Sequence, residues 1–117
     1  MNANDYQKAA LRTSGVHTDT ANKNMKLIYC ALGLSGEAGE FTDAVKKAQF
    51  HGHPDNRDEL IGEIGDVMWY AAVAADVLGV SLGEVMQRNV DKLMKRYPNG
   101  FSTEDSVARV DVNGNNA

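Results

Sequence analysis

Cysteine is almost absent from this 117-residue chain, which contains Cys30 alone. A single cysteine cannot form an internal disulfide, and Cys30 lies within an apolar run, where a free thiol usually behaves as a small hydrophobic side chain. We therefore expect neither a disulfide-stabilised fold nor a redox role.

Long apolar runs are also missing. No uninterrupted apolar stretch approaches the roughly 20 residues that a bilayer-spanning helix needs. The first ten residues, MNANDYQKAA, are polar and lack the apolar segment of a signal peptide. These absences predict a cytoplasmic protein that does not bind membranes.

The sequence has no excess of positive charge either. Its 12 Lys and Arg residues stand against 16 Asp and Glu residues, so the net charge is −4. General binding to polymeric nucleic acid depends on many contacts between basic side chains and phosphates, and is therefore disfavoured. A local basic stripe could still hold a small polyphosphate.

Apolar residues recur at alternating spacings of four and three, which is typical of amphipathic helices. This periodicity predicts long helices over 24–50 and 56–79, the second ending at Gly79. A third helix is predicted from Ser81, which forms a capping-box pattern with Glu84, to Tyr97. A short helix is predicted in DYQKAALRT near the start.

The chain shows no sustained alternation of the kind that strands require, so we predict an all-α fold, a helical bundle of about four helices. We assign residues 1–102 to a single domain. Residues 103–117 are polar, and we expect them to form a mobile tail. Because a chain this short buries only a modest core, association of subunits would stabilise it.

Two acidic pairs have the same spacing on the two long helices. Glu37 and Glu40 lie about 60° apart around the first helix, and Glu63 and Asp66 repeat the spacing on the second. Antiparallel packing of these helices could bring four carboxylates together. Their repulsion would then require a counterion, and carboxylate oxygens are ligands that suit Mg²⁺.

A solvated acidic face is the alternative, because Glu at i and i+3 is common on helix surfaces. Four glycines argue against it. Inside a helix each costs about 1 kcal/mol relative to Ala, and their position beside both acidic pairs indicates close helix approach or room for a ligand. They are Gly36, Gly39, Gly62 and Gly65.

The third predicted helix carries a polar stripe of Asn89, Lys92 and Arg96. Lys92 and Arg96 could hold phosphate oxygens, with Asn89 adding a neutral hydrogen bond. The alternative is a solvated basic face, since cations are favoured near a helix C-terminus in any case.

Other residues near the acidic pairs have two interpretations each. Glu59 is either a further ligand or base, or an acid that stabilises a helix N-terminus. His51 and His53 lack the companions of a zinc site and are interpreted as loop residues, with contact to the substrate as the alternative. Tyr70 could stack on a base, whereas core or interface packing is favoured for Trp69.

The segments ALGLSGEAGEFTDAVKKAQFHGH and DELIGEIGDVMWYAAVAADVLGVSLGEVMQRNVDKLMKRYPNGF together resemble the all-α nucleotide pyrophosphohydrolases of the MazG type, in their compact single-domain form. The family pattern is E-E-x-x-E followed by E-E-x-x-D. Gly36 and Gly62 stand where the leading glutamates would be, which leaves the number of bound ions open.

The resemblance implies that Glu37, Glu40, Glu63 and Asp66 bind Mg²⁺, with Mn²⁺ as a substitute, and carry catalysis. Contacts to the triphosphate would come from a second set of residues: Asn89, Lys92 and Arg96. It further implies conversion of a nucleoside triphosphate to the monophosphate and pyrophosphate by a homodimer or homotetramer. A non-catalytic nucleotide-binding or helical interaction module is the alternative.

Overall fold

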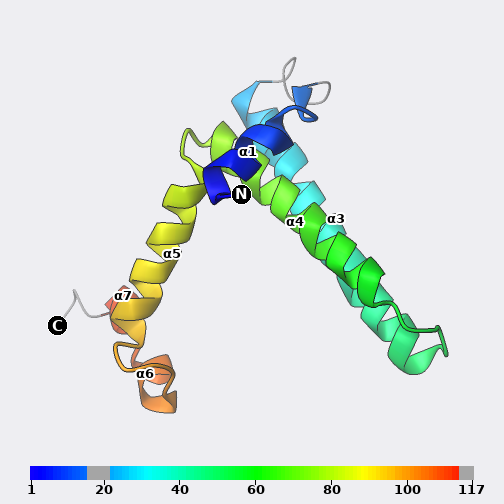
Figure 1. Cartoon of the computed structure of the whole chain (residues 1–117). Coiled ribbons are helices and arrows are strands. Elements are labelled where there is room, and N and C mark those ends of the chain that lie inside the picture. Colours follow the sequence, from blue (N-terminus) through cyan, green and yellow to red (C-terminus); the bar gives the residue numbers. More distant parts are fainter. Residues whose placement is uncertain (16–21, 114–117) are drawn as a thin grey trace. The chain divides into compact units, whose positions relative to one another are not determined.

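A computed structural model of the chain describes residues 1–15 and 22–113 (Figure 1). The chain divides into two compact units, Met1–Leu82 and Gly83–Ala117, each of which is considered by itself. Within the described residues the regular structure is helical, apart from an isolated bridge between Pro98 and Gly100. The predicted all-α fold is confirmed.

Over its described residues the first unit contains α1 (Ala3–Leu11), α3 (Lys23–Phe50) and α4 (Arg57–Val77). Both long helices lie within two residues of their predicted bounds. Helix α3 begins after Asn22, whose side chain accepts a hydrogen bond from the Met25 amide at 2.9 Å and so satisfies a backbone donor of the first turn.

Helix α4 ends at Val77, two residues before Gly79, where the sequence predicts its end. The Gly79 amide donates to the Asp76 carbonyl at 2.9 Å, and the Val80 amide donates to the Ala75 carbonyl at 3.0 Å. This pair of bonds places Gly79 at φ = 77°, a left-handed conformation that favours glycine because it has no Cβ. These bonds close the C-terminal end of α4.

Helices α3 and α4 pack side by side as an antiparallel hairpin (Figure 1). The amide nitrogen of the Asn56 side chain donates to the Ala44 carbonyl at 2.6 Å and so ties the connection to α3. The buried apolar side chains of the described residues are mostly small, which permits close approach of the helices: Ala10, Cys30, Ala44, Ala72, Val73, Ala75 and Leu82. Burial raises the pKa of the Cys30 thiol, in keeping with the expected packing role.

Helix α1 is held against α4 by a buried glutamine. The Gln7 Nε2 group donates to the Ala72 carbonyl at 3.1 Å and to the Val80 carbonyl at 3.3 Å. Its Oε1 atom accepts a hydrogen bond from the Leu82 amide at 3.0 Å. One side chain thus joins α1 to α4 and to the segment that follows α4, up to Leu82.

Trp69 supplies a second link between α1 and α4. Its Nε1 group donates to the Ala10 carbonyl at 3.1 Å and to the Thr13 hydroxyl at 2.9 Å, and its ring packs against the core cluster of Ala10, Ala72 and Leu82. The packing role favoured for Trp69 is therefore observed.

The helices beyond the first unit are α5 (Leu82–Arg96), α6 (Thr103–Ala108) and α7 (Val110–Asn113). Residues 103–113 of the predicted polar, mobile tail include α6 and α7, whereas 114–117 lie outside the described residues. The mobility of the tail stays a prediction. Ser102 caps α6 by accepting a hydrogen bond from the Asp105 amide at 3.1 Å. Polar composition concealed this cap, and the domain boundary at 102 stays a prediction.

None of the described helices is by itself long and apolar enough to cross a membrane. Only when α4 and α5 are counted together are their length and composition sufficient.

Candidate metal centre

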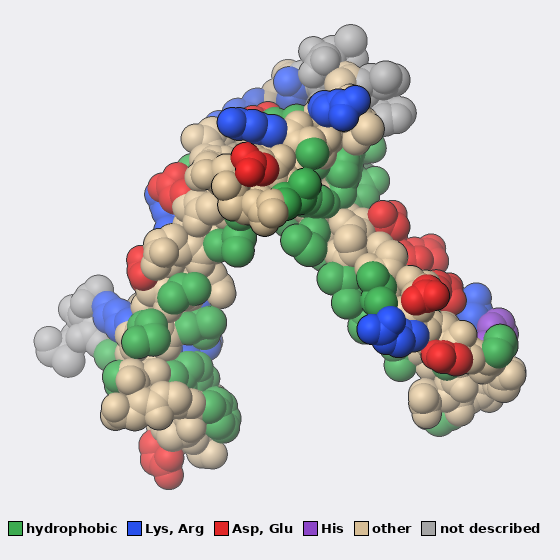
Figure 2. Space-filling view, in the orientation of Figure 1, with side chains coloured by type: hydrophobic (Ala, Val, Ile, Leu, Met, Phe, Trp, Pro, Cys, Tyr) green, Lys and Arg blue, Asp and Glu red, His purple; other side chains and the backbone are tan. Residues whose placement is uncertain are grey.

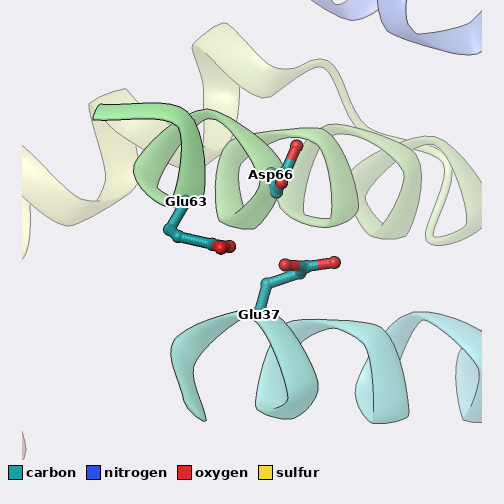
Figure 3. A group of neighbouring side chains, drawn as sticks. All are labelled: Glu37, Glu63 and Asp66. Carbon is teal, nitrogen blue, oxygen red and sulfur yellow. The ribbon is translucent and has the colours of Figure 1, made fainter. Parts of the chain in front are cut away.

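Three carboxylates meet between α3 and α4. Glu37 on α3 faces Glu63 and Asp66 on α4, and one oxygen from each lies within 4.8 Å of the others (Figure 3). The three-residue spacing of Glu63 and Asp66 places both on the side of α4 that faces α3. We call Glu37, Glu63 and Asp66 the carboxylate cluster.

The carboxylate cluster contains a polar atom whose hydrogen-bonding capacity is not satisfied. Glu63 Oε2 is buried and has no hydrogen-bond partner. Burial raises the pKa of Glu63, as do a hydrogen bond with Glu37 and repulsion by Glu37, Asp66 and Glu40. A buried carboxylate oxygen without a donor, among other negative charges, is a cost that a bound cation would remove.

The chemistry of the donors selects the type of cation. The cluster offers carboxylate oxygens and neither histidine nor cysteine, a set that suits a hard divalent ion such as Mg²⁺ or Mn²⁺ rather than zinc. Its residues therefore fit the metal that the sequence analysis predicted.

Glu40 lies outside the carboxylate cluster. Its side chain is exposed on α3, yet its charge acts on two neighbours, because it raises the pKa of Glu63 and of Lys47. Glu59 also raises the pKa of Lys47, although the hydrogen bond between Lys47 and Asp43 has the largest effect. The roles predicted for Glu40 and Glu59 stay predictions.

An aromatic cavity of about 340 Å³ adjoins the carboxylate cluster. Its lining combines two of the carboxylates with aromatic and hydroxyl side chains: Thr13, Tyr29, Glu37, Asp66, Trp69 and Tyr70. A hydrogen bond with Tyr29 is the main cause that raises the pKa of Tyr70 to about 12, followed by burial. The cavity thus offers flat apolar surfaces and neutral hydroxyl groups beside negative charge.

Tyr6, which the sequence pattern did not single out, reaches the same region from α1. The Tyr6 hydroxyl donates to the Gly65 carbonyl at 3.4 Å, and burial followed by the charge of Asp66 raises its pKa. The signal was the spacing of Ala3, Tyr6 and Ala10 on one face of α1, which indicates a packed face but not its partner.

The polar stripe of Asn89, Lys92 and Arg96 belongs to the second unit. Asn89 and Lys92 are exposed on α5. Arg96, at the end of the same helix, donates from Nε and Nη2 to the two carboxylate oxygens of Asp111, both at 2.7 Å. Contact of these three residues with phosphate stays a prediction.

A further cavity of about 450 Å³ lies at the connection between α3 and α4. Lys47, His53, Arg57 and Glu59 are among the residues that line it, whereas the carboxylate cluster contributes none. His51 and His53 are exposed in this connection, as expected for loop residues.

The sequence of the chain is similar to those of known proteins. Residues 28–101 match the family described as the MazG nucleotide pyrophosphohydrolase domain. The chain is 46% identical over 78 residues to the gene 37 protein of Mycobacterium phage L5, a match that covers 63% of this chain and 68% of that protein. It is 40% identical over 73 residues to the uncharacterized protein YvdC of Bacillus subtilis strain 168, covering 55% of this chain and 69% of YvdC. No solved structure matches the chain significantly.

Proposed function

The chain belongs to the MazG nucleotide pyrophosphohydrolase family, and we propose that it hydrolyses a nucleoside or deoxynucleoside triphosphate to the monophosphate and pyrophosphate with Mg²⁺. The observation that carries this proposal is the carboxylate cluster with its buried, unpartnered Glu63 Oε2 atom. Packing alone gives no reason to gather three carboxylates around such an atom.

Glu37, Glu63 and Asp66 would hold the ion, with Glu40 as a further ligand. When bound, Mg²⁺ polarises phosphate oxygens and lowers the pKa of a coordinated water. Either Glu40 or Glu63 accepts the proton of the attacking water. The water oxygen forms the new bond to phosphorus, and the bond to the leaving pyrophosphate breaks.

The remaining parts of the substrate have candidate partners of matching chemistry. Lys92 and Arg96 supply positive charge for the triphosphate, and Asn89 supplies a neutral hydrogen bond. Tyr70 in the aromatic cavity offers a flat surface to the nucleoside, next to Glu37 and Asp66. This activity would give the protein a role in control of the cytoplasmic nucleotide pool.

We propose further that the protein is a homodimer or homotetramer. Large apolar side chains on α3 and α4 are substantially exposed, and apolar surface is visible on both units in Figure 2. The exposed apolar residues of these two helices are Met25, Ile28, Leu32, Val45, Phe50, Ile61, Ile64 and Met68. Their extent supports burial against another subunit.

The test is product analysis with a panel of canonical and modified nucleoside triphosphates, in Mg²⁺ or in EDTA. Monophosphate and pyrophosphate should form only with Mg²⁺. Glu63→Gln should lower kcat by at least about 10²-fold, in the range seen when a group essential to catalysis is removed. The matched variant Glu104→Gln changes an exposed glutamate on α6 and should keep full activity.

An active Glu63→Gln enzyme would contradict the assigned role of the cluster. Binding of nucleotides without any product would instead favour the alternative of a non-catalytic nucleotide-binding module. Neither binding nor turnover would favour a helical interaction module.

A further inference from the structure

The ring of Tyr70 occupies the space where most residues would place a side chain on α3. A Cβ atom added at Gly33 would overlap three ring atoms of Tyr70: Cδ1, Cε1 and Cζ. At Gly36 and Gly39, on the same helix, an added Cβ would meet nothing within 4 Å apart from the helix itself and the adjoining residues. Close contact with another element is thus specific to Gly33 among these three positions.

Tyr70 is enclosed by aromatic neighbours as well. Its ring lies 4.8 Å from that of Trp69, edge to face at 84°, and 5.8 Å from that of Tyr29, tilted at 53°. Because a tyrosine on a helix has few allowed rotamers, the ring cannot move far from Gly33 without losing these contacts. An alanine at position 33 would therefore displace the ring or push the two helices apart.

Such a displacement would reach the aromatic cavity. Gly33 lies four residues before Glu37 and hence on the same face of α3. Tyr70 and Trp69 line the cavity together with Glu37 and Asp66. The position of the Tyr70 ring therefore determines the wall that stands beside two members of the carboxylate cluster.

We propose that Gly33 is a positioning residue, which seats the Tyr70 ring against α3 and so shapes the cavity beside the carboxylate cluster. The placement of the ring does not depend on the proposed function. Its consequence for the substrate, which is correct seating of the nucleoside, does rest on that function.

Paired substitutions test the placement. Gly39→Ala should raise the midpoint of thermal unfolding by about 4 °C, because Ala is the better helix former. Gly33→Ala should lower the midpoint, since overlap with Tyr70 outweighs the gain in propensity. When Tyr70→Ala is already present, adding Gly33→Ala should raise the midpoint as Gly39→Ala does. If Gly33→Ala alone does not fold, the comparison in the Tyr70→Ala background still decides whether overlap with the Tyr70 ring is the cause.

The single tryptophan provides a spectroscopic readout. Gly33→Ala should alter the near-ultraviolet circular dichroism and the fluorescence emission of Trp69, whereas Gly39→Ala should leave both unchanged. A Gly33→Ala protein with a raised midpoint and an unchanged Trp69 signal would overturn the proposal.

Kinetics separate this proposal from the proposed function. In an active enzyme Gly33→Ala should raise KM by about tenfold and change kcat less, as expected when seating is lost but the chemistry remains. An altered Trp69 signal with unchanged KM would overturn the role of the ring in substrate binding. A wild-type protein without turnover would overturn the proposed function, and the midpoints and the Trp69 signal would still decide the placement.

Discussion

The guanidinium of Arg96 is held by both carboxylate oxygens of Asp111, with Nε to Oδ1 and Nη2 to Oδ2 distances of 2.7 Å. The side chains are 18% and 2% exposed, so this is a largely buried, two-bond pair. The residue predicted to bind phosphate thus already has an anionic partner fifteen positions along the chain. A triphosphate that reaches Arg96 has to compete with Asp111.

We predict that Asp111→Asn releases α7 from α5. The substitution removes the charge that pairs with Arg96. The Arg96 side chain, which is only 18% exposed, is then left without its anionic partner. Amide hydrogen exchange at Val112 and Asn113, which bond to the Arg109 carbonyl, should accelerate. Glu104→Gln, at an exposed site on α6, serves as the control. Unchanged exchange in Asp111→Asn would show that the pair does not hold the segment.

The same pair predicts a dependence on pH. Hydrogen bonding to Arg96 lowers the pKa of Asp111 below its ordinary value of 3.8. Because the folded pKa is the lower one, the stabilisation is fully present above about pH 5. It is lost as the pH falls below 3.8 and through the pKa of the folded state. Exchange at Val112, measured from pH 6 to 2 and corrected for the intrinsic rate, should show this loss in the wild type and not in Asp111→Asn.

If the carboxylate cluster binds Mg²⁺, the wild type and Glu63→Gln should differ in how far Mg²⁺ raises their midpoints of thermal unfolding. Without divalent ions, Glu63→Gln should unfold at a higher temperature than the wild type, because it relieves repulsion around a buried oxygen. Added Mg²⁺ should raise the midpoint of the wild type by linkage and have little effect on the variant. Calorimetric melts in EDTA and in Mg²⁺ measure both effects. Equal Mg²⁺ responses would argue against metal binding at Glu63.

A further prediction concerns the contribution of Gln7 to stability, at a site remote from the charged groups. Gln7→Met keeps similar size but removes hydrogen bonds to the Ala72 and Val80 carbonyls and to the Leu82 amide. Since each buried polar group left unpaired costs about 1–3 kcal/mol, the free energy of unfolding should fall by about 2–4 kcal/mol. Urea unfolding measures the change. The exposed neighbour Lys8→Met should stay within about 0.5 kcal/mol of the wild type, as is usual for surface substitutions.

Local chemistry made much of the fold predictable. The bounds of α3 and α4 follow from apolar periodicity and from the breaks at Gly52, Pro54 and Gly79, because helix formation depends on interactions within a few residues. The pairing of Glu63 with Asp66 was predictable for the same reason, since 3.6 residues per turn place i and i+3 on one face.

By itself, then, the sequence determined the bounds of the two long helices, the shared face of Glu63 and Asp66, and a family resemblance that comparison confirmed. Only the tertiary structure decided that Glu37 joins the carboxylate cluster while Glu40 stays outside it. It also decided that Tyr70 meets Gly33 and that Asp111 meets Arg96. These contacts join different helices, and no periodicity within one helix specifies which turn of another helix it will face.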